Sequence, residues 1–140
     1  MTHKFTSSIF PHGWSYAHNC DCTTNGRIGI GWDTSIWNYR VLSSTTLQIT
    51  FQAVNKGDWT SYLSFVYGAY STTQRDLLWQ DLRLINIAHG LKPWALLGDF
   101  NPIRYMDEKL GGANSHSNNW NFNKLIDDLS MSDIRSTGNF

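Results

Sequence analysis

The chain has 140 residues, a formal net charge of zero, 41% hydrophobic residues and seven tryptophans. This length suits one compact domain over 1–140, and this much apolar material excludes an intrinsically disordered chain. No apolar run approaches the roughly 20 residues of a membrane helix, and no signal peptide opens the chain, which predicts an intracellular protein of the nucleus or cytoplasm with no membrane partner. With 11 basic and 11 acidic residues and no run of Lys or Arg, the charge gives no independent support for nucleic-acid binding.

Period-two alternation dominates the first half of the chain and predicts β-strands. Within 46–54, the apolar residues Ile49 and Phe51 alternate with Gln48 and Thr50, a pattern typical of a half-buried strand. Similar patterns predict strands over 26–33, 36–42 and 59–68. Four consecutive strands predict an antiparallel meander.

The apolar period then changes to that of a helix. The segment 71–90 predicts a helix whose buried face comprises Leu77, Leu78, Leu82 and Ile85. This helix crosses over to a strand at 94–98, whose unbroken apolar run is typical of a strand covered on both faces. After a long polar loop, a second helix is expected over about 119–131, with inward side chains from Trp120, Leu125, Ile126 and Leu129.

The strand at 94–98 stops on two polar residues, Asp99 and Asn101. Loops at the carboxyl ends of such strands build the sites of α/β folds. On an extended strand, residues two positions apart point to the same side. The Asp99 carboxylate and the Asn101 amide can therefore contact one ligand, an arrangement that suits phosphoryl transfer. Asp and Asn followed by Pro are also ordinary turn formers, and this structural interpretation stays open.

The segment GDFN, within WALLGDFNPI, resembles the core motif of the endonuclease/exonuclease/phosphatase superfamily. Its flanking segments are similar to the apurinic-type endonuclease domain of plant LINE-type non-LTR retrotransposons; they are GRIGIGWD, FVYGAYSTTQRDLLWQDLR, DEKLGG and LSMSDIRSTGNF. The similarity spans nearly the whole chain. It implies a DNase I-like α/β fold, in which this chain is part of a four-layer α/β/β/α sandwich, and hydrolysis of DNA phosphodiester bonds with magnesium as the cofactor.

The resemblance also implies roles for three residues. Asp99 would orient or activate the attacking water, Asn101 would bind the scissile phosphate, and Tyr67 in FVYG would be the phosphate-side tyrosine. From the residues alone, a tyrosine that closes a strand is more often a half-buried packing residue. The family places further catalytic groups before residue 1 and after residue 140, among them a metal-binding Glu and an Asp–His pair.

Because these catalytic groups are absent from the sequence, we expect the chain to be a fragment with little or no nuclease activity of its own. In the full-length element its partners would be DNA and a reverse transcriptase domain. Two alternatives remain open: a non-catalytic product of a decayed reading frame, and a phosphatase of the same superfamily. No metal site is assigned within the chain, because His18, Cys20 and Cys22 lack a distant second pair of ligands. The acids of DEKLGG, at 107–112, are expected to lie in a solvated loop, and most tryptophans in the core.

Overall fold

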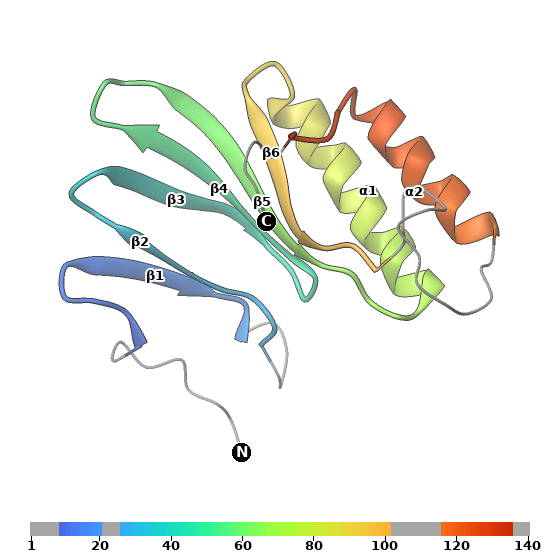
Figure 1. Cartoon of the computed structure of the whole chain (residues 1–140), viewed down its shortest axis with the longest axis horizontal. Coiled ribbons are helices and arrows are strands. Elements are labelled where there is room, and N and C mark those ends of the chain that lie inside the picture. The colour runs from blue at the N-terminus through green and yellow to red at the C-terminus, as the bar shows by residue number, and fades with distance from the viewer. Residues whose placement is uncertain (1–8, 21–25, 102–115, 136–140) are drawn as a thin grey trace.

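The computed structural model describes residues 9–20, 26–101 and 116–135, which form six strands and two helices (Figure 1). In chain order these are β1 (Trp14–His18), β2 (Gly29–Asp33), β3 (Trp37–Ser44), β4 (Gln48–Asn55), β5 (Thr60–Tyr67), α1 (Thr72–His89), β6 (Trp94–Asp99) and α2 (His116–Asp128). Strands β1 and β2 pair with each other, and a second sheet has the order β3–β4–β5–β6. Because β6 alone runs parallel to its neighbour, the described chain is an α/β fold with a mixed sheet.

The four-stranded sheet carries the helices on one face and the β1–β2 pair on the other (Figure 1). On the helix side, side chains of α1 and α2 form a core cluster with Val66 of β5. On the opposite side, Phe51 lies at the centre of a second cluster and contacts the rings of Trp32, Tyr39 and Phe65. The described residues therefore build three layers: helices, mixed sheet and β1–β2 pair.

The predicted meander is right for three strands and wrong for the first. Strands β3, β4 and β5 follow one another antiparallel, whereas β2, within the segment 26–33, pairs with β1. Strand β1 was not predicted. Its five residues, WSYAH, are too few to establish a period, and its aromatic side chains Trp14 and Tyr16 are 41% and 38% exposed.

Helix α1 lies close to its predicted bounds, and three of the four predicted inward residues are buried: Leu78, Leu82 and Ile85. The prediction is wrong for Leu77, which is 56% exposed. At about 100° per residue, the buried positions 75, 78, 79, 82 and 85 gather on one side of the helix, and position 77 falls on the opposite side. Trp79 and Arg75 are therefore buried, although neither was predicted to be.

Helix α2 begins at His116, three residues before the predicted start, and ends at Asp128. Leu125, Ile126 and Leu129 are buried as predicted, but Trp120 is 64% exposed. Phe122 is buried instead, where its ring lies 5.6 Å from that of Trp79 and 5.2 Å from that of Phe100.

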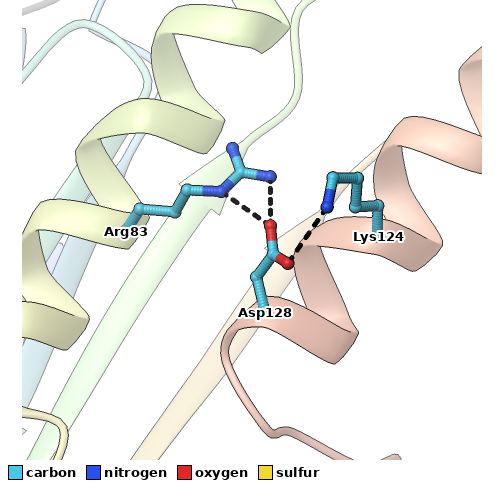
Figure 2. A network of polar contacts seen from close by, with 3 residues as sticks. All are labelled: Arg83, Lys124 and Asp128. Atoms are coloured by element: carbon cyan, nitrogen blue, oxygen red, sulfur yellow. Dashed lines mark hydrogen bonds and ion pairs between the residues drawn. The ribbon is translucent and has the colours of Figure 1, made fainter.

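An ion pair on the surface ties α2 to α1 (Figure 2). The Nε and Nη2 groups of Arg83 donate to Oδ2 of Asp128 at 3.0 and 2.9 Å, and Lys124 Nζ lies 3.4 Å from the other carboxylate oxygen. The hydrogen bond from Arg83, followed by that from Lys124, lowers the pKa of Asp128 below its ordinary value. This contact joins residues 45 positions apart in sequence and lies at the surface, beside the apolar cluster that packs the two helices together.

Strand β6 was predicted to be covered on both faces, and this is wrong for its second half. Its first three residues are half-buried, whereas Leu97, Gly98 and Asp99 are exposed. The reason is its position at the edge of the described sheet, where β5 is its one neighbour. Neither helix of the described residues combines the length and hydropathy needed to cross a membrane.

Strand β4 was predicted to be half-buried, but both of its faces are covered. Gln48 and Thr50 are fully buried on the helix side. Their polar groups belong to a chain of hydrogen bonds that crosses all four strands of the larger sheet. On β3 and β4, Gln48 Nε2 donates to Ser43 Oγ, and Thr50 Oγ1 donates to Gln48 Oε1. Toward β5 and β6, the hydroxyls of Thr50 and Ser64 share a hydrogen bond of 2.7 Å, and Trp94 Nε1 donates to Ser64 Oγ. A polar sequence pattern is therefore compatible with burial here, because the buried groups satisfy one another.

Ser64→Ala is expected to lower the free energy of unfolding by about 2 kcal/mol, because it leaves the indole N–H of Trp94 and the hydroxyl of Thr50 without their partner. Urea denaturation followed by tryptophan fluorescence measures the change. Ser132→Ala, at an exposed position, is the matched control and should stay within about 0.5 kcal/mol of the wild type. Equal stability of the two variants would contradict a structural role for this hydrogen-bond chain.

A buried asparagine fastens the β1–β2 pair to the larger sheet. Asn19 is fully buried, and its Nδ2 donates to the carbonyl oxygens of Thr45 and Thr46, each at 3.1 Å. Its Oδ1 accepts the backbone N–H groups of Arg27 and Ile28, each at 3.0 Å. One side chain thus joins the end of β1, the approach to β2 and the turn between β3 and β4.

Candidate functional site

Tyr67 and Asp99 end two adjacent strands at the same edge of the sheet. Strands β5 and β6 are parallel, and their register pairs Tyr67 with Asp99. Parallel strands need a crossover connection, which α1 supplies, and this connection brings the carboxyl ends of both strands to one edge. Two of the three candidate residues therefore lie side by side, although 32 positions separate them in sequence.

The backbone around this pair adopts a conformation that requires glycine. Gly98 has φ +133°, and a Cβ atom placed there would collide with the carbonyl oxygen of Val66 on β5. Just beyond, the N–H of Gly68 donates to the carbonyl oxygen of Asp99 at 2.5 Å. These two glycines allow β5 and β6 to stay in close contact up to the candidate site.

Asn101 joins the pair through the loop that follows β6. Its backbone N–H donates to Oδ1 of Asp99 at 2.8 Å, its Nδ2 donates to the carbonyl oxygen of Gly68, and its φ is +61°. This is the geometry of a turn closed by an Asp side chain. The structure thus brings all three candidate residues together. It also shows that Asp99 and Asn101 stabilise the turn after β6 through their hydrogen bonds.

Asp99 and Asn101 lie on a cleft of about 730 Å³ beside β6 and the segment after α2. Polar and apolar residues both line the cleft. The apolar residues include Trp94, Leu96, Phe122, Ile126 and Met131, and the polar residues include Asp99, Asn101 and Asp133. A site of this size, with few polar groups near one another, has the usual form of a ligand-binding cleft.

One cationic residue near the site was missed by sequence reasoning. The guanidinium carbon of Arg27 lies 4.8 Å from the centre of the Tyr67 ring. A single Arg before a strand is common on protein surfaces, so no sequence pattern distinguished it. Only the packing of the β1–β2 pair against the sheet brings positions 27 and 67 together.

The described residues do not contain a group of three or more His, Cys, Asp or Glu side chains placed to hold a metal ion. Of the tightly spaced His18, Cys20 and Cys22, the last lies outside the described residues, and so does the acidic segment 107–112. Cys20 is a free thiol, and its backbone N–H donates to Nδ1 of His18 at 3.3 Å.

No family model, curated protein or solved structure matches the chain. The structure alone therefore assigns the fold class. The chain has an α/β fold with a mixed sheet, and its candidate site lies at the carboxyl ends of two parallel strands joined by a helix.

Proposed function

We propose that the chain is a fragment of a magnesium-dependent endonuclease domain of the endonuclease/exonuclease/phosphatase superfamily, of the kind carried by plant LINE-type retrotransposons, with DNA as its substrate. The observation that carries the proposal is the pairing of Tyr67 with Asp99, beside the loop of Asn101. The sequence resemblance assigns phosphodiester chemistry to these same three residues. The layers of helices, mixed sheet and β1–β2 pair are compatible with part of a DNase I-like four-layer sandwich.

In this proposal each residue has a distinct task on the phosphodiester. Asp99 uses Oδ2 to orient the attacking water and draw its proton, because Oδ1 already accepts the N–H of Asn101. Asn101 and the hydroxyl of Tyr67 donate hydrogen bonds to phosphate oxygens, which carry more negative charge in the transition state. The tie between Asn101 and Gly68 keeps that amide at the end of β5.

Magnesium, when bound, would stabilise charge on the phosphate and the leaving oxygen. The described residues offer an incomplete set of ligands for it: Asp99 and Asp133 line one cleft, without a third acidic, His or Cys side chain grouped with them. The resemblance places the remaining metal ligand and the general base in segments outside these 140 residues, and we propose that efficient cutting requires those segments.

A second candidate function is a non-catalytic product of a decayed reading frame. The hydrogen bonds of Asp99 and Asn101 favour it, because a turn alone accounts for both residues. The two candidate functions predict different reading frames in the DNA on either side of the segment that encodes this chain. An in-frame Glu-bearing strand upstream, with an Asp–His segment and a reverse transcriptase downstream, would favour the endonuclease.

Nicking of supercoiled plasmid in magnesium tests the proposal. We expect the 140-residue chain to nick no faster than its Asp99→Ala variant. A protein extended at both ends with the flanking reading frame should nick the plasmid, and Asp99→Ala or Asn101→Ala should return it to background. Strong Asp99-dependent nicking by the 140-residue chain would overturn the assignment as an inactive fragment. Nicking by the extended protein that survives Asp99→Ala would overturn the site.

A further inference from the structure

The cation–π contact between Arg27 and Tyr67 places a positive charge at an otherwise neutral or acidic site. We propose that Arg27 binds a phosphate group of the substrate and holds it against Tyr67 and Asp99. This inference rests on the proposed function, since it concerns the same end of β5 and β6, but nothing in the sequence motif assigned a role to this residue.

The backbone of Arg27 is fixed by a hydrogen bond to the buried side chain of Asn19. Its N–H donates to Oδ1 of Asn19, whose Nδ2 is held by the carbonyl oxygens of Thr45 and Thr46. The N–H of Tyr67 donates to the carbonyl oxygen of Leu47, at 2.9 Å. Arg27 and Tyr67 are therefore both anchored to the same turn between β3 and β4, so the distance between them is set by the core of the protein.

The guanidinium itself remains available to a ligand. Arg27 is exposed, and within the described residues it makes no ion pair. A guanidinium that lies over a ring keeps its N–H groups at its edge, where two parallel hydrogen bonds can reach two phosphate oxygens. The ring reduces the side chain's freedom before binding, so less conformational entropy is lost when the phosphate arrives.

A cation at this place favours binding of a phosphodiester. Asp99 is an acidic residue, and Tyr67 and Asn101 are neutral hydrogen-bond donors, so these three residues do not neutralise the charge of a phosphate. Each cation that neutralises a phosphate also releases a counterion from DNA, which makes its contribution measurable as salt dependence. Arg27 can supply that neutralisation beside the tyrosine that the proposed function uses.

The test measures binding of a fluorescein-labelled DNA duplex to the whole 140-residue chain by anisotropy at several salt concentrations. Arg27→Ala is expected to weaken binding about tenfold and to reduce the salt slope by about one. Arg27→Lys should lie between this variant and the wild type, because it keeps the charge but not the planar pair of donors. Arg40→Ala, at an exposed position of β3, removes the same charge and should change affinity less than about twofold.

A second probe, dimethyl phosphate followed by NMR of the Arg27 and Tyr67 side chains, separates this inference from the proposed function. If the duplex binds and Arg27→Ala behaves like Arg40→Ala, the inference is wrong while the endonuclease assignment stands. If the duplex fails to bind but dimethyl phosphate shifts these resonances in the wild type and not in Arg27→Ala, the phosphate site stands and the assignment to DNA fails. If neither probe binds, the inference is overturned.

Discussion

Gly98→Ala is expected to lower the free energy of unfolding by about 3 kcal/mol or more, or to abolish cooperative unfolding. Two causes add at this position. Residues other than glycine rarely adopt a φ of +133°, and the new methyl group would collide with the carbonyl oxygen of Val66 on β5. The collision pushes apart the two strands that carry Tyr67 and Asp99. Urea denaturation gives the stability, and amide hydrogen exchange of β5 and β6 shows whether their pairing is lost.

Gly13→Ala is the matched control for backbone strain. Gly13 also has a positive φ, +87°, but a Cβ atom there meets nothing within 4 Å. This variant should cost about 1 kcal/mol, from strain alone. The difference between the two variants then measures the collision with β5 together with the greater backbone strain at φ +133°. Equal losses at both positions would contradict close contact between the backbones of β5 and β6.

Asn19→Asp is expected to cost about 3 kcal/mol at pH 7, although the two side chains have nearly the same shape. The change keeps an acceptor for the N–H groups of Arg27 and Ile28. It replaces the Nδ2 donor by an oxygen that faces the carbonyl oxygens of Thr45 and Thr46. Burial and these two oxygens disfavour the charged carboxylate and should raise the pKa of the introduced carboxyl group in the folded state.

The same variant should therefore gain stability relative to the wild type as the pH falls. A group whose pKa is raised on folding stabilises the protein below its unfolded pKa, about 4 for Asp, and loses that contribution as the pH rises through the folded value. Urea denaturation of both proteins between about pH 4 and pH 7 measures the difference. Asn38→Asp, at an exposed position of β3, should show little pH-dependent loss. A constant penalty at position 19 across this range would exclude the buried hydrogen-bond arrangement.

The sequence predicted those elements whose side chains show a clear period. Strands β3, β4 and β5 and helix α1 all lie near their predicted bounds, because an alternating or helical apolar pattern marks each of them. Trp120 was assigned to the core because it is large and apolar, yet neighbouring elements, not residue type, decide which face of α2 is covered. The burial of Gln48 and Thr50 was missed for the same reason, since their partners lie on other strands.

In the candidate site too, some features could be predicted from the sequence and others depend on tertiary packing. The resemblance grouped Tyr67 with Asp99 in one site, and the structure brings them together because α1 crosses over between two parallel strands whose ends meet. Arg27 could not be predicted, because its approach to Tyr67 depends on how the β1–β2 pair packs against the larger sheet. Local patterns report which side chains lie near one another on the same element, whereas contacts between layers are set by tertiary packing.

The chain of hydrogen bonds beneath α1 also selects one strand register. An indole N–H can only donate and the Gln48 carbonyl oxygen can only accept, so the hydroxyl of Ser64 donates to Thr50 and the hydroxyl of Thr50 donates to Gln48. A slip of β5 by two residues would keep every side chain on its face, and an apolar surface would tolerate it. Here the slip would set the hydroxyl of Thr50 opposite Tyr62 or Val66 and leave buried donors unpaired. The polar side chains in this layer thus exclude a competing sheet that hydrophobic packing alone would permit.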